Sequence, residues 1–241
     1  MKVLSIGNSF STDAHKYLHR IAKLNGFDIF TANLFVGGCS LESHWLSVCE
    51  SYACYEYELN GNEAERKISI RQALESDSWD VVTLQQASAF SGMIDTYEPY
   101  LTNLVQLVRQ TNPQAKIYFH KTWSYENGSE HSGFVGYGSD SRNMYECICK
   151  ASEFAAQKIN ADIIPVGDVI QYLRENTKEF DYENGGLSLC RDTFHLSEDY
   201  GRYAAAATWF HILTGEKLTV CRFEEFDLGL LEIITEAVNK L

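Results

Sequence analysis

Short apolar runs alternate with amphipathic helical segments along almost the whole chain, and this alternation restricts the fold more than any other feature. The predicted strands cover residues 3–6, 27–36, 80–84, 116–120 and 162–165. The predicted helices cover residues 12–24, 68–75, 97–111, 142–159, 166–176 and 198–213, and a further helix follows residue 227. Strands and helices in alternation form βαβ units. We therefore predict an α/β fold, a three-layer α/β/α sandwich around a doubly wound parallel sheet.

The pattern indicates one unit rather than several. The 241 residues are enough to bury a full core, and no linker, repeat or low-complexity tract divides them. Residues 39–67 are predicted to be irregular. Residues 124–141 are predicted to form a loop that is long for a segment without a function. We predict a single domain over residues 1–241.

The charge balance restricts the class of partner. The formal net charge is −13, with 20 Lys and Arg against 33 Asp and Glu. Nucleic acids and anionic membranes attract proteins largely through Lys and Arg. The balance therefore argues against both as partners and favours a neutral or weakly polar small-molecule substrate. It leaves the oligomeric state open.

Targeting signals and cysteine usage point to one compartment. The first predicted strand begins at residue 2, so we expect no signal peptide, and no apolar stretch is long enough to span a bilayer. We predict a cytoplasmic protein whose seven irregularly spaced cysteines are reduced thiols. These are Cys39, Cys49, Cys54, Cys147, Cys149, Cys190 and Cys221. Cys147 and Cys149 are two residues apart and would point to different sides of a helix, so we predict no metal site there.

A serine follows the first predicted strand, on a turn. Gly7 and Asn8 end the strand, Ser9 lies next, and Ser11 or Thr12 is predicted to cap the following helix. Open α/β sheets bind ligands at the carboxyl ends of their strands. A serine in that position either acts as an acyl-transfer nucleophile beside backbone N–H groups or only shapes the turn.

An aspartate and a histidine lie three residues apart just before the last long helix. Asp192 and His195 can meet across one turn, so the spacing predicts His195 as a general base and Asp192 as the group that orients it. Ser9 would be the nucleophile. The turns at residues 37–38 and 85–86 and the loop at 121–141 follow other strands, so all these groups are expected at one edge of the sheet.

The other candidate residues are given weaker roles. His15 and His19 are expected on the solvated face of the first helix rather than on a metal, and His120 could line the pocket. Six aromatic residues lie in segments expected to rim the site, where they either stack on a sugar ring or pack under the loops. They are Trp45, Tyr52, Tyr55, Tyr57, Trp123 and Tyr125.

Four short segments, or blocks, at residues 7–9, 37–40, 84–88 and 192–195 carry a family resemblance. In them the chain resembles the SGNH (GDSL-like) hydrolase superfamily, and most of all a poorly characterised bacterial branch with Gly-Asn-Ser in the first block. The superfamily has Gly-Asp-Ser where this chain has Asn8 before Ser9. Gly38 matches the second block, whose glycine N–H contributes to the oxyanion hole. Asp192 and His195 match the last block directly. The resemblance implies a flavodoxin-like sandwich and a Ser-His-Asp triad of Ser9, His195 and Asp192.

The third block departs from the superfamily pattern. The superfamily has an asparagine there, whose amide completes the oxyanion hole, and this chain has Gln85 and Gln86. A glutamine amide can donate the same kind of hydrogen bond. We expect Gln85 to take that role, with Gln86 or the Ser88 hydroxyl as alternatives, because strand alternation directs only one glutamine toward the site.

The resemblance implies a serine esterase. His195 would take the Ser9 proton while the N–H groups of Ser9 and Gly38 and the Gln85 amide hold the oxyanion, and no metal or organic cofactor is expected. A small acyl ester, acetyl on a carbohydrate, is the expected substrate, and transfer to an acceptor other than water stays open. The alternative is a weak or inactive domain of this fold that binds a glycan or another small ligand. A phosphate-binding flavodoxin-like protein fits less well, because the chain has no P-loop motif.

Overall fold

A single sheet organises the computed structural model, which describes residues 1–63, 66–220 and 222–241. Within these residues the strand order is β4-β3-β2-β1-β5-β6-β7. The strands are β1 Lys2–Gly7, β2 Phe30–Phe35, β3 Tyr55–Leu59, β4 Lys67–Ile68, β5 Val81–Leu84, β6 Lys116–His120 and β7 Asp162–Ile164. Strands β2, β1, β5, β6 and β7 are parallel, as the βα alternation predicts.

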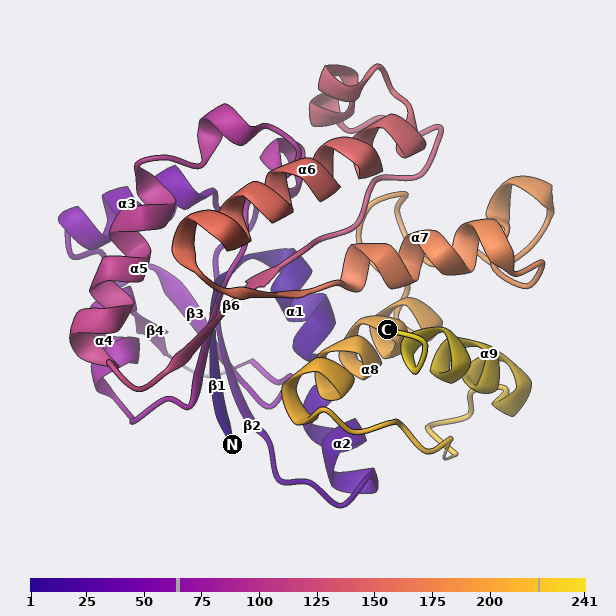
Figure 1. The fold of residues 1–241 in the computed structure, drawn as a ribbon, viewed down its shortest axis with the longest axis horizontal. Coiled ribbons are helices and arrows are strands. Elements are labelled where there is room, and N and C mark those ends of the chain that lie inside the picture. Colours follow the sequence, from indigo (N-terminus) through magenta and orange to yellow (C-terminus); the bar gives the residue numbers. More distant parts are fainter. Residues whose placement is uncertain (64–65, 221) are drawn as a thin grey trace.

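Helices cover both faces of the sheet, which makes three layers (Figure 1). One layer contains α3 Leu41–Cys49, α4 Ile70–Glu75, α5 Tyr100–Thr111 and α6 Ser141–Ile159. The other contains α1 Ser9–His15, α2 Leu18–Leu24, α7 Val166–Asn176, α8 Tyr200–Thr214 and α9 Leu228–Val238. Short 3₁₀ turns lie in the loops at Ser88–Phe90, Ile94–Thr96, Ser132–Tyr137 and Tyr182–Asn184. The predicted α/β/α sandwich is confirmed.

The segment expected to be irregular, residues 39–67, is instead largely ordered. It contains α3, β3 and the start of β4, and β3 runs antiparallel to both β2 and β4, so the sheet is mixed. Tyr55 and Tyr57 are buried while Glu56 between them is half-buried, an alternation typical of a strand. Residues 64–65 of this segment, and Cys221 among the cysteines, lie outside the described residues.

The first helix also differs from the prediction. The expected helix over residues 12–24 is two helices, α1 and α2, and α1 begins earlier, at Ser9. Its cap is Asn8, whose side chain accepts a hydrogen bond from the N–H of Phe10, rather than Ser11 or Thr12. The predicted cap was wrong because Asn is as good a capping residue as Ser, and only the backbone geometry decides between them.

The crossover beside β1 gives the fold its binding edge. The chain runs from β1 outward to β2 and later returns to the other side of β1 with β5, so β1 lies at the point where the strand order reverses. Loops on either side of such a point separate and leave room for a ligand at the carboxyl ends of the strands. Ser9 follows the carboxyl end of β1 and therefore lies at this point.

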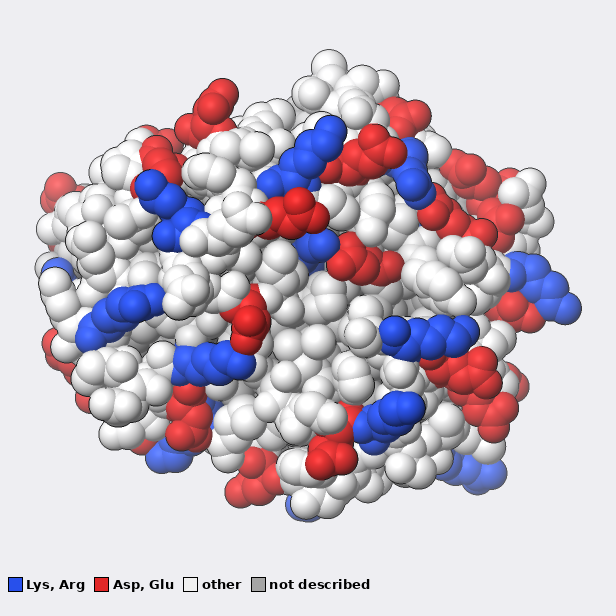
Figure 2. All heavy atoms as spheres, viewed as in Figure 1, with Lys and Arg blue, Asp and Glu red and all other residues white. Residues whose placement is uncertain are grey.

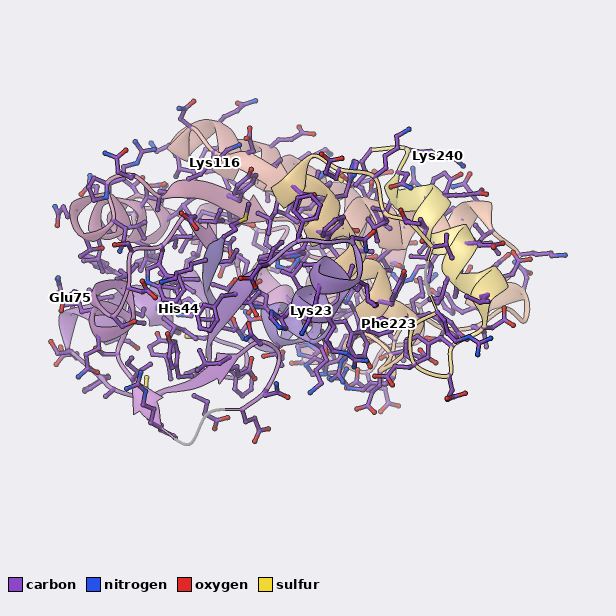
Figure 3. The ribbon with its side chains drawn as sticks, turned by 90° about the horizontal axis from the view of Figure 1, so that it is seen from below. Lys23, His44, Glu75, Lys116, Phe223 and Lys240 are labelled. Atoms are coloured by element: carbon purple, nitrogen blue, oxygen red, sulfur yellow. The ribbon has the colours of Figure 1, made fainter. Side chains whose placement is uncertain are left out.

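Each face of the sheet has its own apolar core. One core packs Trp123, Trp209 and Phe210 with α1, α7, α8 and α9, and the other packs Leu34, Tyr55 and Leu104 with α3, α4 and α5. In Figure 3, His44 and Glu75, from α3 and α4, lie to the left, and Phe223 and Lys240 lie to the right.

The charged side chains are distributed over the surface. On the face drawn in Figure 2, Lys and Arg side chains alternate with Asp and Glu rather than forming a continuous basic stripe. No helix within the described ranges is long and apolar enough to cross a membrane.

Three histidines are buried and held neutral. His15, His44 and His120 are at most 1% exposed, and burial lowers the pKa of each from 6.5 to about 3, with the neighbouring His15 lowering that of His120 further. His15 was expected on a solvated face. It instead hydrogen-bonds the Ser5 hydroxyl at 2.8 Å and packs edge-on against Trp209. The α1–α2 break removes the regular spacing on which that prediction depended.

These histidines make stability depend on pH. Below pH 6.5 these histidines bind protons in the unfolded chain but stay neutral in the folded chain. Their contribution to the free energy of unfolding is therefore fully present above about pH 6.5 and is lost as the pH falls toward 3. At pH 5 each histidine is expected to cost roughly 2 kcal/mol. Urea unfolding at pH 7.5 and pH 5 measures the loss, and in His44→Gln the loss between the two pH values should shrink by roughly 2 kcal/mol. An unchanged difference would contradict the assignment.

Candidate active site

Ser9 and His195 lie within hydrogen-bonding distance, although 186 residues separate them. Ser9 is the first residue of α1 and is half-buried, and its Oγ lies 2.9 Å from His195 Nε2. His195 Nδ1 lies 2.7 Å from Asp192 Oδ2. The structure therefore brings together the three residues that the sequence pattern predicts as nucleophile, base and orienting group.

The protons in this chain of contacts follow from donor and acceptor chemistry. An ionised carboxylate only accepts, so the proton of a neutral His195 ring is on Nδ1 and directed at Asp192. Nε2 is then free to accept the hydroxyl proton of Ser9. This is the tautomer that a general base needs in order to activate a serine.

Asp192 also shapes the turn that carries His195. Its Oδ1 accepts hydrogen bonds from the backbone N–H groups of His195 at 2.7 Å and Phe194 at 3.3 Å, and Thr193 has a left-handed backbone with φ of 71°. Partial burial raises the pKa of the Asp192 carboxyl, but the hydrogen bonds from His195 and Phe194 outweigh it and hold the pKa below its usual value. Asp192 is therefore ionised at neutral pH.

Trp123 supports the same turn from the core side. Its ring stacks on Phe10 with 4.1 Å between centroids, and its indole N–H donates to the Phe194 carbonyl at 2.7 Å. The ring is fully buried, so it is unavailable for stacking on a sugar. Tyr55, Tyr57 and Tyr125 are buried as well. Of the six aromatics expected near the rim, Trp45 is half-buried and only Tyr52 is exposed.

Two backbone N–H groups near Ser9 are available to a ligand. Among the described residues, neither the N–H of Ser9 nor that of Gly38 has a hydrogen-bond acceptor. Gly38 is exposed, has a left-handed backbone with φ of 64°, and has open space where a Cβ would lie. A backbone N–H in such a turn can donate to an oxyanion.

The two glutamines of the third block have different environments. The Gln86 amide nitrogen donates to the carbonyl and hydroxyl of Thr96, and its oxygen accepts from Leu41 and Ala87, so Gln86 ties loops together. The Gln85 amide nitrogen has one partner, the Asn8 side chain at 2.7 Å, which leaves one amide hydrogen unused within the described residues. Of the two glutamines, Gln85 is therefore the one that can still donate.

The Ser88 hydroxyl, the third alternative, lies 2.7 Å from the Tyr125 hydroxyl. Either oxygen can be the donor, so one proton of this pair stays available. Ser88 is half-buried and begins a short 3₁₀ turn after β5. The oxyanion role of Gln85 stays a prediction.

Asn8 links the three segments that carry the candidate oxyanion donors. Its side-chain oxygen accepts from the Gln85 amide at 2.7 Å and from the N–H of Phe10 at 3.0 Å. Its side-chain nitrogen donates to the Cys39 carbonyl at 3.1 Å, next to Gly38. Gln85 in turn accepts from Nδ1 of the buried His120, which therefore supports Gln85 from the core rather than lining the pocket.

This arrangement explains the departure from Gly-Asp-Ser in physical terms. Asn8 is 1% exposed and uses both its donor and its acceptor, and a carboxylate would lose the bond to Cys39 while being buried without a cation. The sequence pattern indicated only a turn at Asn8. Its position immediately before a helix is the capping signal that could have suggested more.

Replacing Asn8 by aspartate, the superfamily residue, is therefore expected to lower activity. The loss of the Cys39 contact should free the Gly38 turn and reduce kcat for an ester by roughly 10- to 100-fold, less than the loss of a whole oxyanion donor. Steady-state kinetics at pH 8 measure it, with Asn176→Asp, the same change at an exposed position on α7, as the control. An Asn8→Asp variant that is as active as wild type would exclude this role of the Cys39 contact.

A family and its fold can now be assigned. Residues 2–225 match the family described as Domain of unknown function (DUF4886). The chain belongs to the DUF4886 family. A crystal structure of a DUF4886 family protein from Bacteroides uniformis ATCC 8492 is similar over 100% of this chain and 93% of that chain, with 34% identity and a TM-score of 0.92. No curated protein matches the chain.

More distant structures connect this DUF4886 chain to the SGNH hydrolases. A Slackia heliotrinireducens protein assigned to the SGNH hydrolases has a TM-score of 0.62 and 20% identity, over 88% of this chain and 98% of that one. A variant of an acetyl-xylooligosaccharide esterase from Geobacillus stearothermophilus has a TM-score of 0.56 and 14% identity, over 92% and 97% of the two chains. At these identities the likeness concerns the fold. The predicted resemblance to a poorly characterised SGNH branch is confirmed.

Proposed function

We propose that this DUF4886 protein is a serine esterase that hydrolyses a small acyl ester, an acetyl ester on a carbohydrate, through Ser9, His195 and Asp192. The observation that carries the proposal is the pair of contacts at His195, 2.9 Å to the Ser9 hydroxyl and 2.7 Å to the Asp192 carboxylate. A nucleophile, a base and an orienting carboxylate in this order are what acyl transfer through an acyl-enzyme requires.

The proposed reaction has two halves. His195 Nε2 takes the Ser9 proton as Oγ attacks the ester carbonyl, and the oxyanion accepts hydrogen bonds from the N–H groups of Ser9 and Gly38 and from the Gln85 amide. The bond to the alkoxy group then breaks, and His195 gives its proton to the leaving alcohol. In the second half His195 takes a proton from water, which attacks the acyl-Ser9 ester. His195 then returns the proton to Ser9 Oγ as the carboxylic acid leaves.

The substrate class is supported by the fold neighbours and by the site's surroundings. One neighbour of the same fold is named as an esterase of acetylated xylooligosaccharides. The Gly38 turn is open, Trp45 on the helix that follows it is half-buried, and Tyr52 just beyond that helix is exposed. An open turn beside aromatic surface suits a carbohydrate ester of small acyl size.

Hydrolysis of p-nitrophenyl acetate and labelling by a fluorophosphonate test the proposal together. Turnover of the acetate, with the adduct located on Ser9 by peptide mass spectrometry, is the expected result. The acetyl ester should be cleaved faster than the octanoyl ester, and acetate should be released from acetylated xylooligosaccharides. Absence of both turnover and labelling in the folded protein would favour the alternative, a glycan-binding domain, which calorimetry with xylooligosaccharides would then detect.

Acyl transfer to an acceptor other than water is distinguished by the products. If acetylated xylooligosaccharide gives free acetate in proportion to the ester consumed, the reaction is hydrolysis. If ester is consumed and the acetyl group appears on added unacetylated sugar, the same site catalyses transfer, and the hydrolytic part of the proposal is wrong.

A further inference from the structure

Asp13 is a buried carboxylate one helical turn after Ser9 on α1. Its side chain is 0% exposed, and four hydrogen-bond contacts reach its two oxygens from outside α1. A fully buried carboxylate is costly unless charged partners and hydrogen bonds satisfy it, so a chain that keeps one needs a compensating gain. The partners of Asp13 indicate what that gain is.

The partners of Asp13 flank the turn that carries Asp192 and His195. Arg191, just before the turn, contacts Asp13 Oδ1 at 3.0 Å and Oδ2 at 3.2 Å. The backbone N–H of Leu196, just after the turn, donates to Oδ2 at 2.9 Å. Arg191 also donates to the Leu196 carbonyl and closes the base of the turn. One carboxylate therefore holds both ends of the segment.

The remaining contact of Asp13 joins two helices and does not involve the turn. Arg202, on α8, donates from Nε to Asp13 Oδ1 at 2.8 Å. Helix α8 packs against α1, so this contact joins two helices of one layer. Arg191 and Arg202 thus share one carboxylate, but only Arg191 belongs to the segment that carries the base. This difference separates positioning from general stability.

We propose that Asp13 is a positioning residue. Its carboxylate holds the Asp192–His195 turn against α1 at the position where His195 Nε2 is within hydrogen-bonding distance of Ser9 Oγ. Ser9 and Asp13 are four residues apart and project from the same side of one rigid helix. The distance between nucleophile and base is then set through a single turn of helix rather than through the long connection between them. The catalytic meaning of this device rests on the proposed esterase function.

The internal bonds of the turn make the proposal specific. Asp192 accepts from both the ring and the backbone N–H of His195, so the Asp192–His195 pair stays intact if the turn moves as a unit. Breaking the contacts of Asp13 with Arg191 and Leu196, which we call the clamp, should then change the distance from His195 to Ser9. It should not change the hydrogen bonds between His195 and Asp192. A misplacement of about 1 Å is enough to cost about 100-fold in rate.

The experiment compares Arg191→Gln with Arg202→Gln. In Arg191→Gln, kcat for p-nitrophenyl acetate should fall by about 100-fold, with KM within about twofold and the pH midpoint of the acid limb of kcat/KM unchanged. Fluorophosphonate labelling of Ser9 should slow in parallel. Arg202→Gln should lower Tm at least as much but keep kcat within about threefold. Asp13→Asn, where it folds, should behave as Arg191→Gln does.

Crystal structures of the two variants test the geometry without any activity. The Ser9 Oγ to His195 Nε2 distance should exceed 3.5 Å in Arg191→Gln and stay near 2.9 Å in Arg202→Gln. An unchanged distance in Arg191→Gln, or equal losses of kcat in both variants, would overturn the positioning role. Failure of the proposed function is a different result, because wild type itself would then show no Ser9-dependent turnover.

Discussion

Replacing Ser9 by alanine is expected to lower kcat for p-nitrophenyl acetate by on the order of 10⁵- to 10⁶-fold and to abolish fluorophosphonate labelling. The variant loses the hydroxyl that hydrogen-bonds His195 Nε2 at 2.9 Å. It keeps the Asn8 cap of α1, which depends on the Asn8 side chain and the Phe10 N–H. The fold should therefore survive, and the loss should be one of chemistry.

The matched control for this change is Ser88→Ala, another half-buried serine at the carboxyl edge of the sheet. Its hydroxyl contacts Tyr125 rather than His195, so its rate should fall by less than about tenfold. A loss of 10²- to 10³-fold in Ser88→Ala would instead assign Ser88 to the oxyanion hole in place of Gln85. Undiminished turnover by Ser9→Ala would remove the basis of the esterase proposal.

Asp192→Asn is expected to give the second-largest effect, a loss in kcat of up to about 10⁴-fold. An asparagine amide can donate its N–H to His195 Nδ1, and the ring proton would then be on Nε2. A protonated Nε2 cannot accept the hydroxyl proton of Ser9. Asn can still accept from the backbone N–H groups of Phe194 and His195, so the turn should keep its shape. KM should change little, because Asp192 contacts His195 rather than the substrate.

Thermal unfolding distinguishes this mechanism from a loss of folding. Asp192→Asn should keep a Tm close to that of wild type while kcat falls, because the N–H groups of Phe194 and His195 keep their acceptor. Asp140→Asn is the control, since Asp140 caps α6 away from the site and Asn caps as well as Asp. Equal activity in Asp192→Asn and wild type would leave His195 without an orienting partner in the proposed mechanism.

The sequence by itself determined the layered α/β fold and the edge where the site lies. The apolar runs of β1, β5 and β6 and the period of α5, α6 and α7 are local patterns, and local patterns predict elements well. The three-residue spacing of Asp192 and His195 predicted a contact within one turn, which the structure contains. The serine after β1 was recognisable because a turn directly after a buried strand has few sequence solutions.

The tertiary structure decided what depends on distant residues. The antiparallel β3 and β4, the burial of His15 under Trp209 and the capping of α1 by Asn8 all follow from packing between segments far apart in the chain. The choice between the two glutamines is of the same kind, since Thr96 and Leu41 engage Gln86 and Asn8 engages Gln85.

The same division applies to the candidate site. Sequence identifies a nucleophile, a base and a carboxylate by their chemistry and local spacing. The clamp formed by Asp13 joins residues about 180 positions apart, and no local pattern marks an aspartate in a helix as the anchor of a distant turn. Residue types and short spacings are local properties, whereas the distance from Ser9 to His195 is set only when α1, β1 and the turn at residues 192–195 pack together.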